Sequence, residues 1–364
     1  MSQFFALPVT GKKQETSDAV SISFLIPDDL KDKFKYKAGQ YLTLEVDING
    51  EKLRRAYSLC SCPLTDDQLT VTVKRVDDGK VSTKLNGPLQ LGQSIMVMPP
   101  EGRFTPEISA DNKKHYFLFA GGSGITPMMS IIRTVLKAEQ NSCITLVYAN
   151  RNKNSVIFKN ELEELAKTEK GRLDVVLSYD TADMFWFGLK GFLTSDAIKK
   201  QVLKHERGMT NEFYICGPAA MMDTVKNGLL EMNVPKDSIH IEYFIAPTTA
   251  KAENQPVTPA NTPVSVPAVN ADGGTQMKLT INGETHDIFV KNKKTILAAA
   301  QDAGLDPPYS CEAGICSTCM AKVTSGKVRM IENNILTEKE VANGYILTCQ
   351  SLCESPEVSV EYYD

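Results

Sequence analysis

Four cysteines near the end of the chain strongly limit how it can fold, because three of them share one short loop. Cys311, Cys316 and Cys319 stand close together, and Cys349 follows after 29 intervening residues. A loop that supplies three thiolates, with a fourth from a distant segment, has the spacing of a plant-type [2Fe-2S] site. The loop residues are small, so backbone N–H groups can approach the sulfur atoms closely. The pattern predicts a cluster-binding domain and a protein that transfers electrons.

The other cysteines have simpler interpretations. Cys353 lies four residues beyond Cys349 and is the alternative fourth ligand, but the spacing favours Cys349. Cys60 and Cys62 form a lone C-x-C without partners for a tetrahedral metal site, and Cys143 lies in a predicted strand, so packing is the expected role of all three. The spacing lacks the paired C-x2-C knuckles of structural zinc, which argues against a non-redox docking module.

The cysteine count and the hydropathy of the chain indicate in which cellular compartment the protein is found. The chain has nine cysteines, an odd number, which argues against a secreted, disulfide-stapled protein and for a reducing environment. The N-terminus lacks a charged region followed by an apolar stretch, and no run approaches the length of about 18 apolar residues needed for a membrane span. We expect a soluble, cytoplasmic protein with no membrane insertion and no nucleic-acid partner.

The negative charge is concentrated at one end. Residues 276–364 hold 8 Lys and Arg against 12 Asp and Glu, a balance of −4 that equals that of the whole chain. The rest of the chain is therefore neutral. The acidic side chains near the C-terminus form either solvated surface or a docking face that steers a basic partner towards the cluster. They include Glu354, Glu357, Glu361 and Asp364.

A change of composition separates the cluster domain from the rest. Residues 247–275 are rich in Pro, Ala, Thr and Asn and contain no aromatic residue, which predicts a flexible linker. The ferredoxin-like domain is expected over 276–364.

Residues 1–108 show short alternating strands separated by turn signals such as Asn49-Gly50 and Asp78-Gly79, which predict a small antiparallel β-barrel. The predicted strands include Ala19–Ile26, Tyr41–Ile48, Leu69–Val76 and Ser94–Met98.

Residues 112–246 alternate strands and helices, which predicts an α/β doubly wound nucleotide-binding domain. The predicted strands are Tyr116–Ala120, Cys143–Ala149, Leu173–Ser178, Glu212–Cys216 and Ile239–Phe244. The predicted helices are Met128–Ala138, Ser155–Lys167, Ser195–His205 and Ala219–Met232.

A glycine-rich turn links the first strand and helix of this second domain. It runs Ala120-Gly121-Gly122-Ser123-Gly124-Ile125-Thr126-Pro127. Glycines let the backbone approach a pyrophosphate, and a helix N-terminus favours its negative charge. Thr126 is the expected N-cap and Pro127 the expected first helical residue.

The barrel carries a second set of candidates. Arg55-Ala56-Tyr57-Ser58 ends a predicted strand, and Gly79-Lys80-Val81-Ser82 precedes a short helix. A guanidinium holds phosphates, a tyrosine stacks on a planar ring and a serine donates to a ring nitrogen. The alternative is that Tyr57 belongs to the core and Arg55 faces solvent.

These motifs occur in the order of the ferredoxin-NADP reductase family, and the chain resembles its members that carry a C-terminal plant-type [2Fe-2S] ferredoxin domain. The resemblance is greatest to reductase components of the phenylacetyl-CoA epoxidase type and spans nearly the whole chain except the linker. It implies an α+β (β-grasp) fold for the ferredoxin domain. The segments that carry it are Leu53–Ser58, Ile215–Met222 and Gly344–Gln350.

The resemblance implies a role for each candidate. Arg55 would hold the FAD diphosphate, with Lys80, Val81 and Ser82 completing that site. Tyr57 would stack on the flavin ring and Ser58 would bond near its reactive nitrogen. Thr126 and Cys216 would flank the nicotinamide, and the turns around Gly121, Gly122, Gly124, Pro127, Gly217 and Pro218 would bind the nucleotide. Phe244 would cover the flavin, or it is simply core. Ser58, Thr126 and Cys216 are the predicted catalytic residues, and no His or Glu is given an acid–base role.

The coenzyme preference depends on the end of the second strand of the wound domain. An acid there would bind the ribose hydroxyls of NADH, but this strand is followed by Arg151. Arg151 is placed to meet the extra phosphate of NADPH, although a surface arginine also needs no ligand. We expect NADPH, with NADH as the alternative.

Together the motifs predict a flavin and iron–sulfur reductase. NAD(P)H gives two electrons at once and the cluster accepts one, a mismatch that FAD bridges. By resemblance, the acceptor is an oxygenase of the phenylacetyl-CoA epoxidase type. Desaturases, ring-hydroxylating oxygenases and hybrid-cluster proteins are served by similar reductases, and a stand-alone diaphorase is a further alternative.

Overall fold

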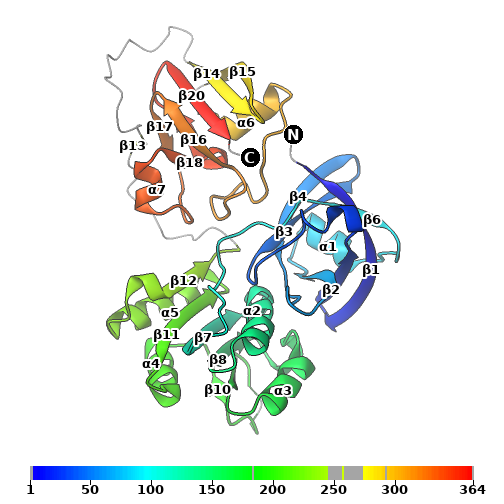
Figure 1. Cartoon of the computed structure of the whole chain (residues 1–364), viewed down its shortest axis with the longest axis vertical. Coiled ribbons are helices and arrows are strands. Elements are labelled where there is room, and N and C mark those ends of the chain that lie inside the picture. Colours follow the sequence, from blue (N-terminus) through cyan, green and yellow to red (C-terminus); the bar gives the residue numbers. More distant parts are fainter. Residues whose placement is uncertain (1–2, 183, 245–255, 258–273, 292, 363–364) are drawn as a thin grey trace. The chain divides into compact units, whose positions relative to one another are not determined.

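The computed structural model describes residues 3–182, 184–244, 256–257, 274–291 and 293–362, with only the backbone at 256–257. Two compact units are present (Figure 1). Phe4–Phe244 make up one unit, and the described residues from 256 onwards belong to the other. Among the described residues, no helix combines the length and apolar character that a bilayer crossing requires.

The first part of the larger unit is the expected antiparallel barrel. Its strands are ordered β4-β3-β6-β1-β2-β5, and a bridge between Leu59 and Val71 joins the end of β4 to β5 and closes the barrel. Helix α1 (Lys80–Asn86) packs against the strands. The strands are β1 (Phe5–Thr16), β2 (Ala19–Leu25), β3 (Tyr41–Ile48), β4 (Glu51–Ser58), β5 (Gln68–Lys74) and β6 (Ser94–Val97).

The long strand β1 was missed by the sequence analysis, because Pro8 and Gly11 interrupt its alternation and its register shifts between Val9 and Gly11. The Asn49-Gly50 turn was predicted correctly. Both residues have positive φ, 57° and 84°, and they join β3 to β4.

The second part is the expected doubly wound domain, with a fully parallel sheet ordered β10-β9-β8-β7-β11-β12. From β7 the chain first adds β8, β9 and β10 on one side, and then adds β11 and β12 on the other side. The carboxyl ends of β7 and β11 therefore form the topological switch point of the fold. The strands are β7 (Lys114–Gly121), β8 (Cys143–Asn150), β9 (Leu173–Tyr179), β10 (Leu189–Lys190), β11 (Thr210–Cys216) and β12 (Ile239–Glu242). The helices are α2 (Ile125–Ala138), α3 (Lys159–Thr168), α4 (Ser195–His205) and α5 (Ala219–Glu231).

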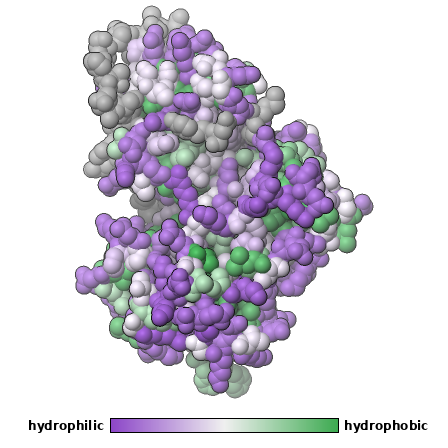
Figure 2. Space-filling view, in the orientation of Figure 1, coloured by the Kyte–Doolittle hydropathy of each residue, from purple (hydrophilic) through white to green (hydrophobic). Residues whose placement is uncertain are grey.

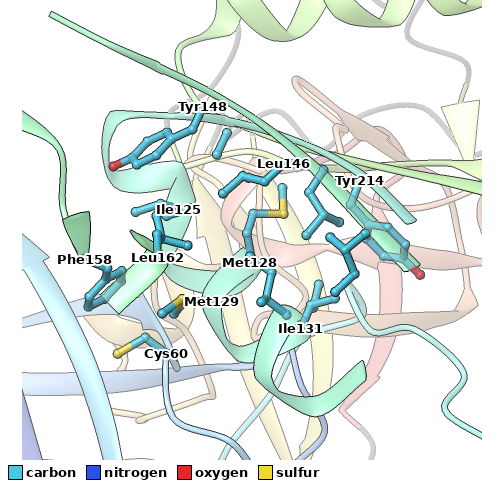
Figure 3. Packing of buried hydrophobic residues seen from close by; sticks show 14 of the residues in the cluster. Cys60, Ile125, Met128, Met129, Ile131, Leu146, Tyr148, Phe158, Leu162 and Tyr214 are labelled. Atoms are coloured by element: carbon cyan, nitrogen blue, oxygen red, sulfur yellow. The ribbon is translucent and has the colours of Figure 1, made fainter. Parts of the chain in front are cut away.

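Helix α2 fills one face of this sheet. Ile125, Met128 and Ile131 are fully buried and pack with Leu146 and Tyr214 from the strands (Figure 3). The opposite face of the sheet packs against α4 and α5 through a separate apolar cluster. Both faces are thus covered, which explains why the strands read as continuous apolar runs.

Two predicted boundaries differ from the structure. The helix expected over Ser155–Lys167 begins only at Lys159, because Phe158 adopts a left-handed φ of 60° that breaks the helical path. The strand expected over Ile239–Phe244 ends at Glu242, where its pairing with Cys216 is the last in the ladder.

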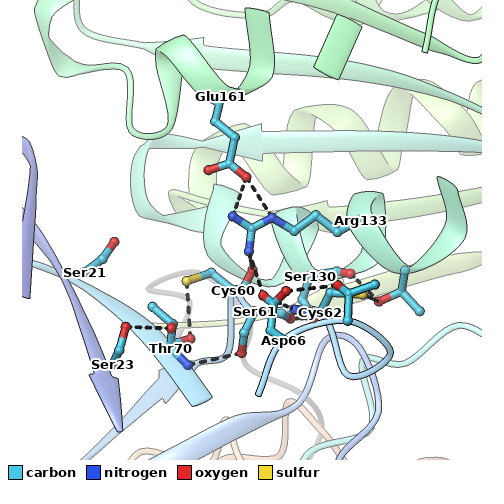
Figure 4. A network of polar contacts seen from close by, with 12 residues as sticks. Ser21, Ser23, Cys60, Ser61, Cys62, Asp66, Thr70, Ser130, Arg133 and Glu161 are labelled. Carbon is cyan, nitrogen blue, oxygen red and sulfur yellow. Dashed lines mark hydrogen bonds and ion pairs between the residues drawn. The ribbon is translucent and has the colours of Figure 1, made fainter. Parts of the chain in front are cut away.

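A polar network joins the barrel to the wound domain (Figure 4). Arg133 of α2 donates from Nε to Glu161 Oε1 at 2.8 Å and from Nη1 to the carbonyl of Cys60 at 2.9 Å, and it lies 3.4 Å from Asp66. Ser130 donates to the carbonyl of Ser61 at 2.6 Å. Cys60, Cys62 and Cys143 are buried, as their predicted packing roles require.

The smaller unit contains a five-stranded mixed sheet ordered β15-β14-β20-β16-β18, in which β14 and β20 run parallel. Helix α6 (Ile296–Asp302) buries Ile296, Leu297 and Ala300 in its core, as expected for an α+β ferredoxin fold. The remaining elements are β14 (Gly274–Ile281), β15 (Glu284–Lys291), β16 (Met320–Ser325), β18 (Tyr345–Leu347), β20 (Glu357–Tyr362), the sheet of β13 (Pro256–Val257), β17 (Val328–Met330) and β19 (Ser351–Cys353), and α7 (Glu338–Ala342).

The predicted linker over 247–275 lies mostly outside the described residues. Two of its residues form β13, which pairs antiparallel with Val328 and Arg329 of β17. Strand β14 begins at Gly274, inside the predicted linker, and buries alternate residues from Thr275 to Ile281.

The Arg133 network gives a test of how the barrel is held to the wound domain. We expect Arg133→Met to lower the free energy of unfolding of this unit by about 2 kcal/mol, because the charge-assisted bonds to Glu161 and Cys60 are lost. Unfolding in urea, followed by fluorescence of Trp186, the single tryptophan, measures this. Lys137→Met on the exposed part of α2 is the matched control. Equal destabilisation of both variants would contradict the interpretation.

Candidate functional site

The glycine-rich turn and the loop after β11 touch backbone to backbone at the carboxyl edge of the sheet. A Cβ on Gly124 would lie 2.1 Å from the carbonyl oxygen of Cys216, and a Cβ on Gly217 would lie 2.9 Å from the nitrogen of Gly121. A Cβ on Gly121 would meet Pro218 at 2.6 Å. Both loops therefore need glycine, and the contact brings the predicted nucleotide-binding residues together.

Thr126 is close to this contact, but its predicted capping role is wrong. The turn forms a 3-10 helix over Gly122–Gly124, so α2 begins at Ile125, Gly124 is the N-cap, and Pro127 is the third helical residue. Thr126 is buried and donates to the carbonyl of Ser123 at 3.0 Å, which braces the turn from inside the helix. The sequence misplaced the helix start because Thr-Pro is the stronger local start signal.

Arg151 follows β8 at the same edge. Its side chain is exposed, and its carbonyl accepts a hydrogen bond from the N–H of Thr181 at 2.9 Å. Asn152 caps the next short turn by accepting from the N–H of Asn154 at 2.9 Å. The backbone of Arg151 is thus fixed beside the end of β9, and its side chain is exposed.

The flavin candidates stand on β4 and the start of α1. Arg55 is exposed and donates to the carbonyl of Arg54 at 2.6 Å, whereas Tyr57 is partly buried against the barrel core. Burial raises the pKa of the Tyr57 hydroxyl, and nearby Arg55 opposes this shift. Ser58 is buried at the end of the strand.

Lys80, Val81 and Ser82 form the first turn of α1, where backbone N–H groups have no partner within the helix. The Ser82 hydroxyl accepts from the N–H of Val76 at 3.1 Å and donates to the carbonyl of Gly79 at 3.3 Å. Lys80 pairs with Glu51 at 2.8 Å on the surface. This turn therefore offers backbone donors to a diphosphate, while the Ser82 side chain stabilises the turn itself.

Glu242 is a candidate residue that the sequence analysis missed. The Ser58 hydroxyl donates to Glu242 Oε2 at 3.3 Å, although the two residues are 184 positions apart. Burial raises the pKa of the Glu242 carboxyl to about 8, and the Ser58 bond opposes this rise. The pKa of the neighbouring Cys216 thiol is raised well above its ordinary value by burial and then by Glu242. The available signal was an acid at the end of a short strand, just before the candidate Phe244.

Phe244 lies two residues beyond this carboxyl. Its side chain is 37% exposed, so it is not a core residue. The structure thus places Ser58, Cys216 and Glu242 in one group at the junction of the barrel and the wound domain, with Phe244 at its surface.

The four cysteines of the smaller unit are brought together by sheet pairing. Met320 pairs with Leu347 across β16 and β18, and Thr348 donates to the carbonyl of Cys319 from its N–H at 3.1 Å and from its hydroxyl at 3.0 Å. Gln350 donates to the carbonyl of Glu312 at 2.9 Å. These contacts place Cys349 beside the loop that contains the other three cysteines.

The sulfur atoms interact as a group. The Sγ atoms of Cys311 and Cys316 are 3.1 Å apart, and the N–H of Ala313 donates to Cys311 Sγ at 3.4 Å. The pKa of the Cys349 thiol is raised by its hydrogen bonds with Cys311 and Cys319. Among the described residues, no three His, Cys, Asp or Glu side chains form a site for a single ion. The donor set of four thiols with a backbone N–H on one sulfur fits a [2Fe-2S] cluster.

Cys353 is separate from this group. It lies on β19. Burial raises the pKa of its thiol to about 12, and a hydrogen bond with Thr275 opposes this rise. Because Cys353 bonds with Thr275 and not with the other cysteines, Cys349 is favoured as the fourth cysteine of the group.

The chain matches three domain families. Residues 6–105 match the oxidoreductase FAD-binding domain, residues 118–227 the oxidoreductase NAD-binding domain, and residues 279–354 the 2Fe-2S iron-sulfur cluster binding domain. These matches give the chain FAD, a nicotinamide nucleotide and a [2Fe-2S] cluster as cofactors.

Curated relatives extend over the full length. The chain is 34% identical to one of the subunits of 1,2-phenylacetyl-CoA epoxidase from Escherichia coli, covering 100% of this chain and 98% of that protein. It is 36% identical to the ferredoxin reductase component of 3-ketosteroid-9-alpha-monooxygenase of Rhodococcus rhodochrous, covering 99% and 97%. It is 32% identical to a glycine betaine monooxygenase reductase subunit of Chromohalobacter salexigens, covering 96% and 93%.

Among solved structures, phthalate dioxygenase reductase is similar in fold, with a TM-score of 0.58 and 24% identity over 99% of this chain and 98% of that one. The chain belongs to the ferredoxin-NADP reductase family of oxidoreductases, in the group whose members combine FAD-binding and NAD-binding domains with a C-terminal [2Fe-2S] domain.

Proposed function

We propose that this protein is the reductase component of an oxygenase system, taking electrons from NADPH and delivering them through its [2Fe-2S] domain. The observation that carries the proposal is the convergence of Ser58, Cys216 and Glu242 where the barrel meets the glycine loops. FAD bound there would accept one hydride, which carries two electrons, and would pass these electrons on to the cluster one at a time.

The barrel residues would bind and orient the flavin. Arg55 would exchange its bond to the Arg54 carbonyl for the FAD diphosphate, and the free N–H groups of Lys80, Val81 and Ser82 would complete that site. Tyr57 would lie against the ring, and Ser58 would present its hydroxyl to the reactive nitrogen. Phe244, exposed beside Glu242, would cover the ring until a nicotinamide replaces it.

The wound domain would hold the nucleotide. The turn of Gly121, Gly122 and Gly124 allows a close approach of the pyrophosphate, and Gly217 and Pro218 give the nicotinamide a flat surface. Thr126 and Cys216 would flank that ring. Glu242, held by Ser58, would position the serine hydroxyl and keep a proton near it.

The finer part of the proposal is the acceptor. Support for a partner of the phenylacetyl-CoA epoxidase type, and hence a role in phenylacetate breakdown, comes from the resemblance at Leu53–Ser58, Ile215–Met222 and Gly344–Gln350. The acidic C-terminal domain would dock on a basic surface of that partner. Arg329 binds Glu354 at 2.9 Å, so Glu354 is neutralised and the docking face would depend on other acids, such as the exposed Glu357.

Reconstitution tests the acceptor. The purified reductase would be combined with the oxygenase components of phenylacetyl-CoA epoxidase, 3-ketosteroid 9α-monooxygenase and glycine betaine monooxygenase, with NADPH supplied. We expect product formation to be fastest with the epoxidase. Faster turnover with either of the others would overturn the finer proposal and keep the reductase role.

The ligand assignment predicts different outcomes for two neighbouring cysteines. Cys349→Ser removes a thiol that interacts with Cys311 and Cys319, so we expect loss of the cluster. Cys353→Ser is the matched control and should keep it, because Cys353 contacts Thr275 instead. Iron and sulfide content and the visible spectrum measure the cluster. The reverse pattern would refute the assignment.

Arg151 should decide the coenzyme preference. We expect Arg151→Ala to raise KM for NADPH about tenfold, the loss of one charge-assisted phosphate contact, and to leave KM for NADH unchanged. Lys167→Ala, an exposed cation on α3, serves as control. A lower KM for NADH than for NADPH in the native protein would refute this role of Arg151.

Glu242 should make stability depend on pH. Its pKa of about 8 lies above the ordinary 4.5, so the folded state keeps a proton that the unfolded state loses. This contribution to stability is fully present below about pH 4.5 and falls as the pH rises towards 8. Glu242→Gln removes this loss of stability. The unfolding free energy of the variant, relative to the native protein, should therefore rise by about 2 to 3 kcal/mol between pH 5 and pH 7.

Urea unfolding across this pH range measures the effect, with the exposed Glu163→Gln as control. A difference between the Glu242→Gln and native proteins that stays constant with pH would show that the Glu242 carboxyl titrates normally.

A further inference from the structure

The cysteine loop of the smaller unit contains a residue in a backbone conformation that its type disfavours. Glu312, directly after Cys311, has a φ of 54°, in the left-handed region. Residues other than glycine rarely adopt this region, because their Cβ crowds the backbone. Since the sequence has a glutamate here, other contacts must hold the turn in this conformation.

The turn at Glu312 aims a backbone donor at a sulfur atom. The N–H of Ala313 donates to Cys311 Sγ at 3.4 Å, and this bond spans Glu312. The conformation of Glu312 therefore decides whether the N–H can reach the sulfur. A hydrogen bond to a cluster sulfur stabilises the reduced cluster more than the oxidised one, because the reduced cluster carries more negative charge, and so raises the reduction potential.

The side chain of Gln350 holds the same peptide group from its other side. Its Nε2 donates to the carbonyl of Glu312 at 2.9 Å, although the two residues are 38 positions apart. That carbonyl and the N–H of Ala313 belong to one planar peptide group and point in opposite directions. A donor that fixes the oxygen therefore also fixes the direction of the N–H, towards Cys311.

Gln350 is itself held in place beside Cys349. It is the last residue of a short 3-10 turn, Thr348–Gln350, and β19 follows directly. Its carbonyl accepts from the N–H of Ile331 at 2.7 Å. A Cβ on Gly314 would meet Gln350 Cγ at 3.0 Å, so the methylene part of the side chain lies against the cysteine loop. The donor is thus anchored to the segment that supplies the fourth cysteine.

The turn lies where water can reach it. Cys311 is partly exposed, whereas Cys316, Cys319 and Cys349 are buried. The side chain of Glu312 is exposed, and the described surface of this unit that faces the viewer is mostly hydrophilic or intermediate in hydropathy (Figure 2). Water competes for exposed backbone groups, so the bond to Cys311 depends on a turn that is already held in place.

We propose that Gln350 is a positioning residue that raises the reduction potential of the [2Fe-2S] cluster, by holding the Glu312 carbonyl so that the Ala313 N–H points at Cys311 Sγ. The inference rests on the proposed function, in which electrons leave through this cluster. A higher potential at the cluster favours transfer of each electron from the flavin to the cluster over the reverse transfer.

The test measures the midpoint potential of the cluster in the full-length holoprotein, by titration with dithionite and redox mediators and by the EPR signal of the reduced cluster. Gln350→Met keeps the methylene contact with Gly314 and removes the donor. We expect the equilibrium constant for one-electron reduction to fall about tenfold, which lowers the potential by about 59 mV. Gln276→Met, an exposed glutamine of β14, is the matched control and should keep the native potential.

A second pair of variants tests the path through Glu312. Glycine adopts a left-handed φ without strain, so a Glu312→Gly protein depends less on Gln350 to hold the turn. Adding Gln350→Met to Glu312→Gly should therefore lower the equilibrium constant by only about twofold, compared with about tenfold when it is added to the native protein.

Each outcome decides the proposal. An unchanged potential in Gln350→Met overturns it, and so does an equal shift with and without Glu312→Gly, which would mean that the amide acts on the cluster directly. Loss of iron on adding Gln350→Met to either protein also overturns it, because the residue would then be needed for folding of the loop. Since dithionite supplies the electrons, failure of NADPH to reduce the native protein would refute the proposed function separately.

Discussion

The close contact of two glycine loops is the constraint on which the rest of the larger unit depends. Gly124 touches the backbone of Cys216, and Gly217 touches that of Gly121, so no side chain separates the ends of β7 and β11. The proposed positions of the pyrophosphate and the nicotinamide ring depend on this contact. It also fixes the start of α2, whose Arg133 and Ser130 hold the barrel loop around Cys60 and Ser61. One backbone contact thereby ties coenzyme binding to the position of the flavin-binding barrel.

The cysteine site of the smaller unit depends on sheet register in a similar way. Cys319 precedes β16 and Cys349 follows β18, and the pairing of these strands brings both residues to one end. A shift of one residue would turn the following side chains to the opposite face. Because ligands from distant segments meet only in the folded state, binding of the cluster and folding of this unit are linked.

Local patterns predicted most of the fold but not how its parts meet. Strand β3 and helix α4 matched their predicted bounds, because alternation and helical periodicity are local signals. Strand β1 was missed since Pro8 and Gly11 break its pattern, and the Thr126 cap was wrong because the 3-10 turn before it is set by the contact with Cys216. Glu242 was missed for a related reason: nothing in Ile239–Phe244 indicates that its neighbour is Ser58, 184 residues away.

A carboxyl group buried beside a serine hydroxyl is costly for a fold to keep. The larger unit holds Glu242 with one hydrogen bond, at 3.3 Å, and burial raises the pKa of its carboxyl to about 8. An apolar residue at the end of β12 would avoid that cost, as apolar residues do elsewhere in this sheet. Strongly shifted carboxyl groups that face a cofactor site are typical of residues selected for function over stability. In the proposed function, the Glu242 carboxyl would therefore belong with Ser58 and Cys216 in the flavin site, where its task would be to hold the serine hydroxyl in place.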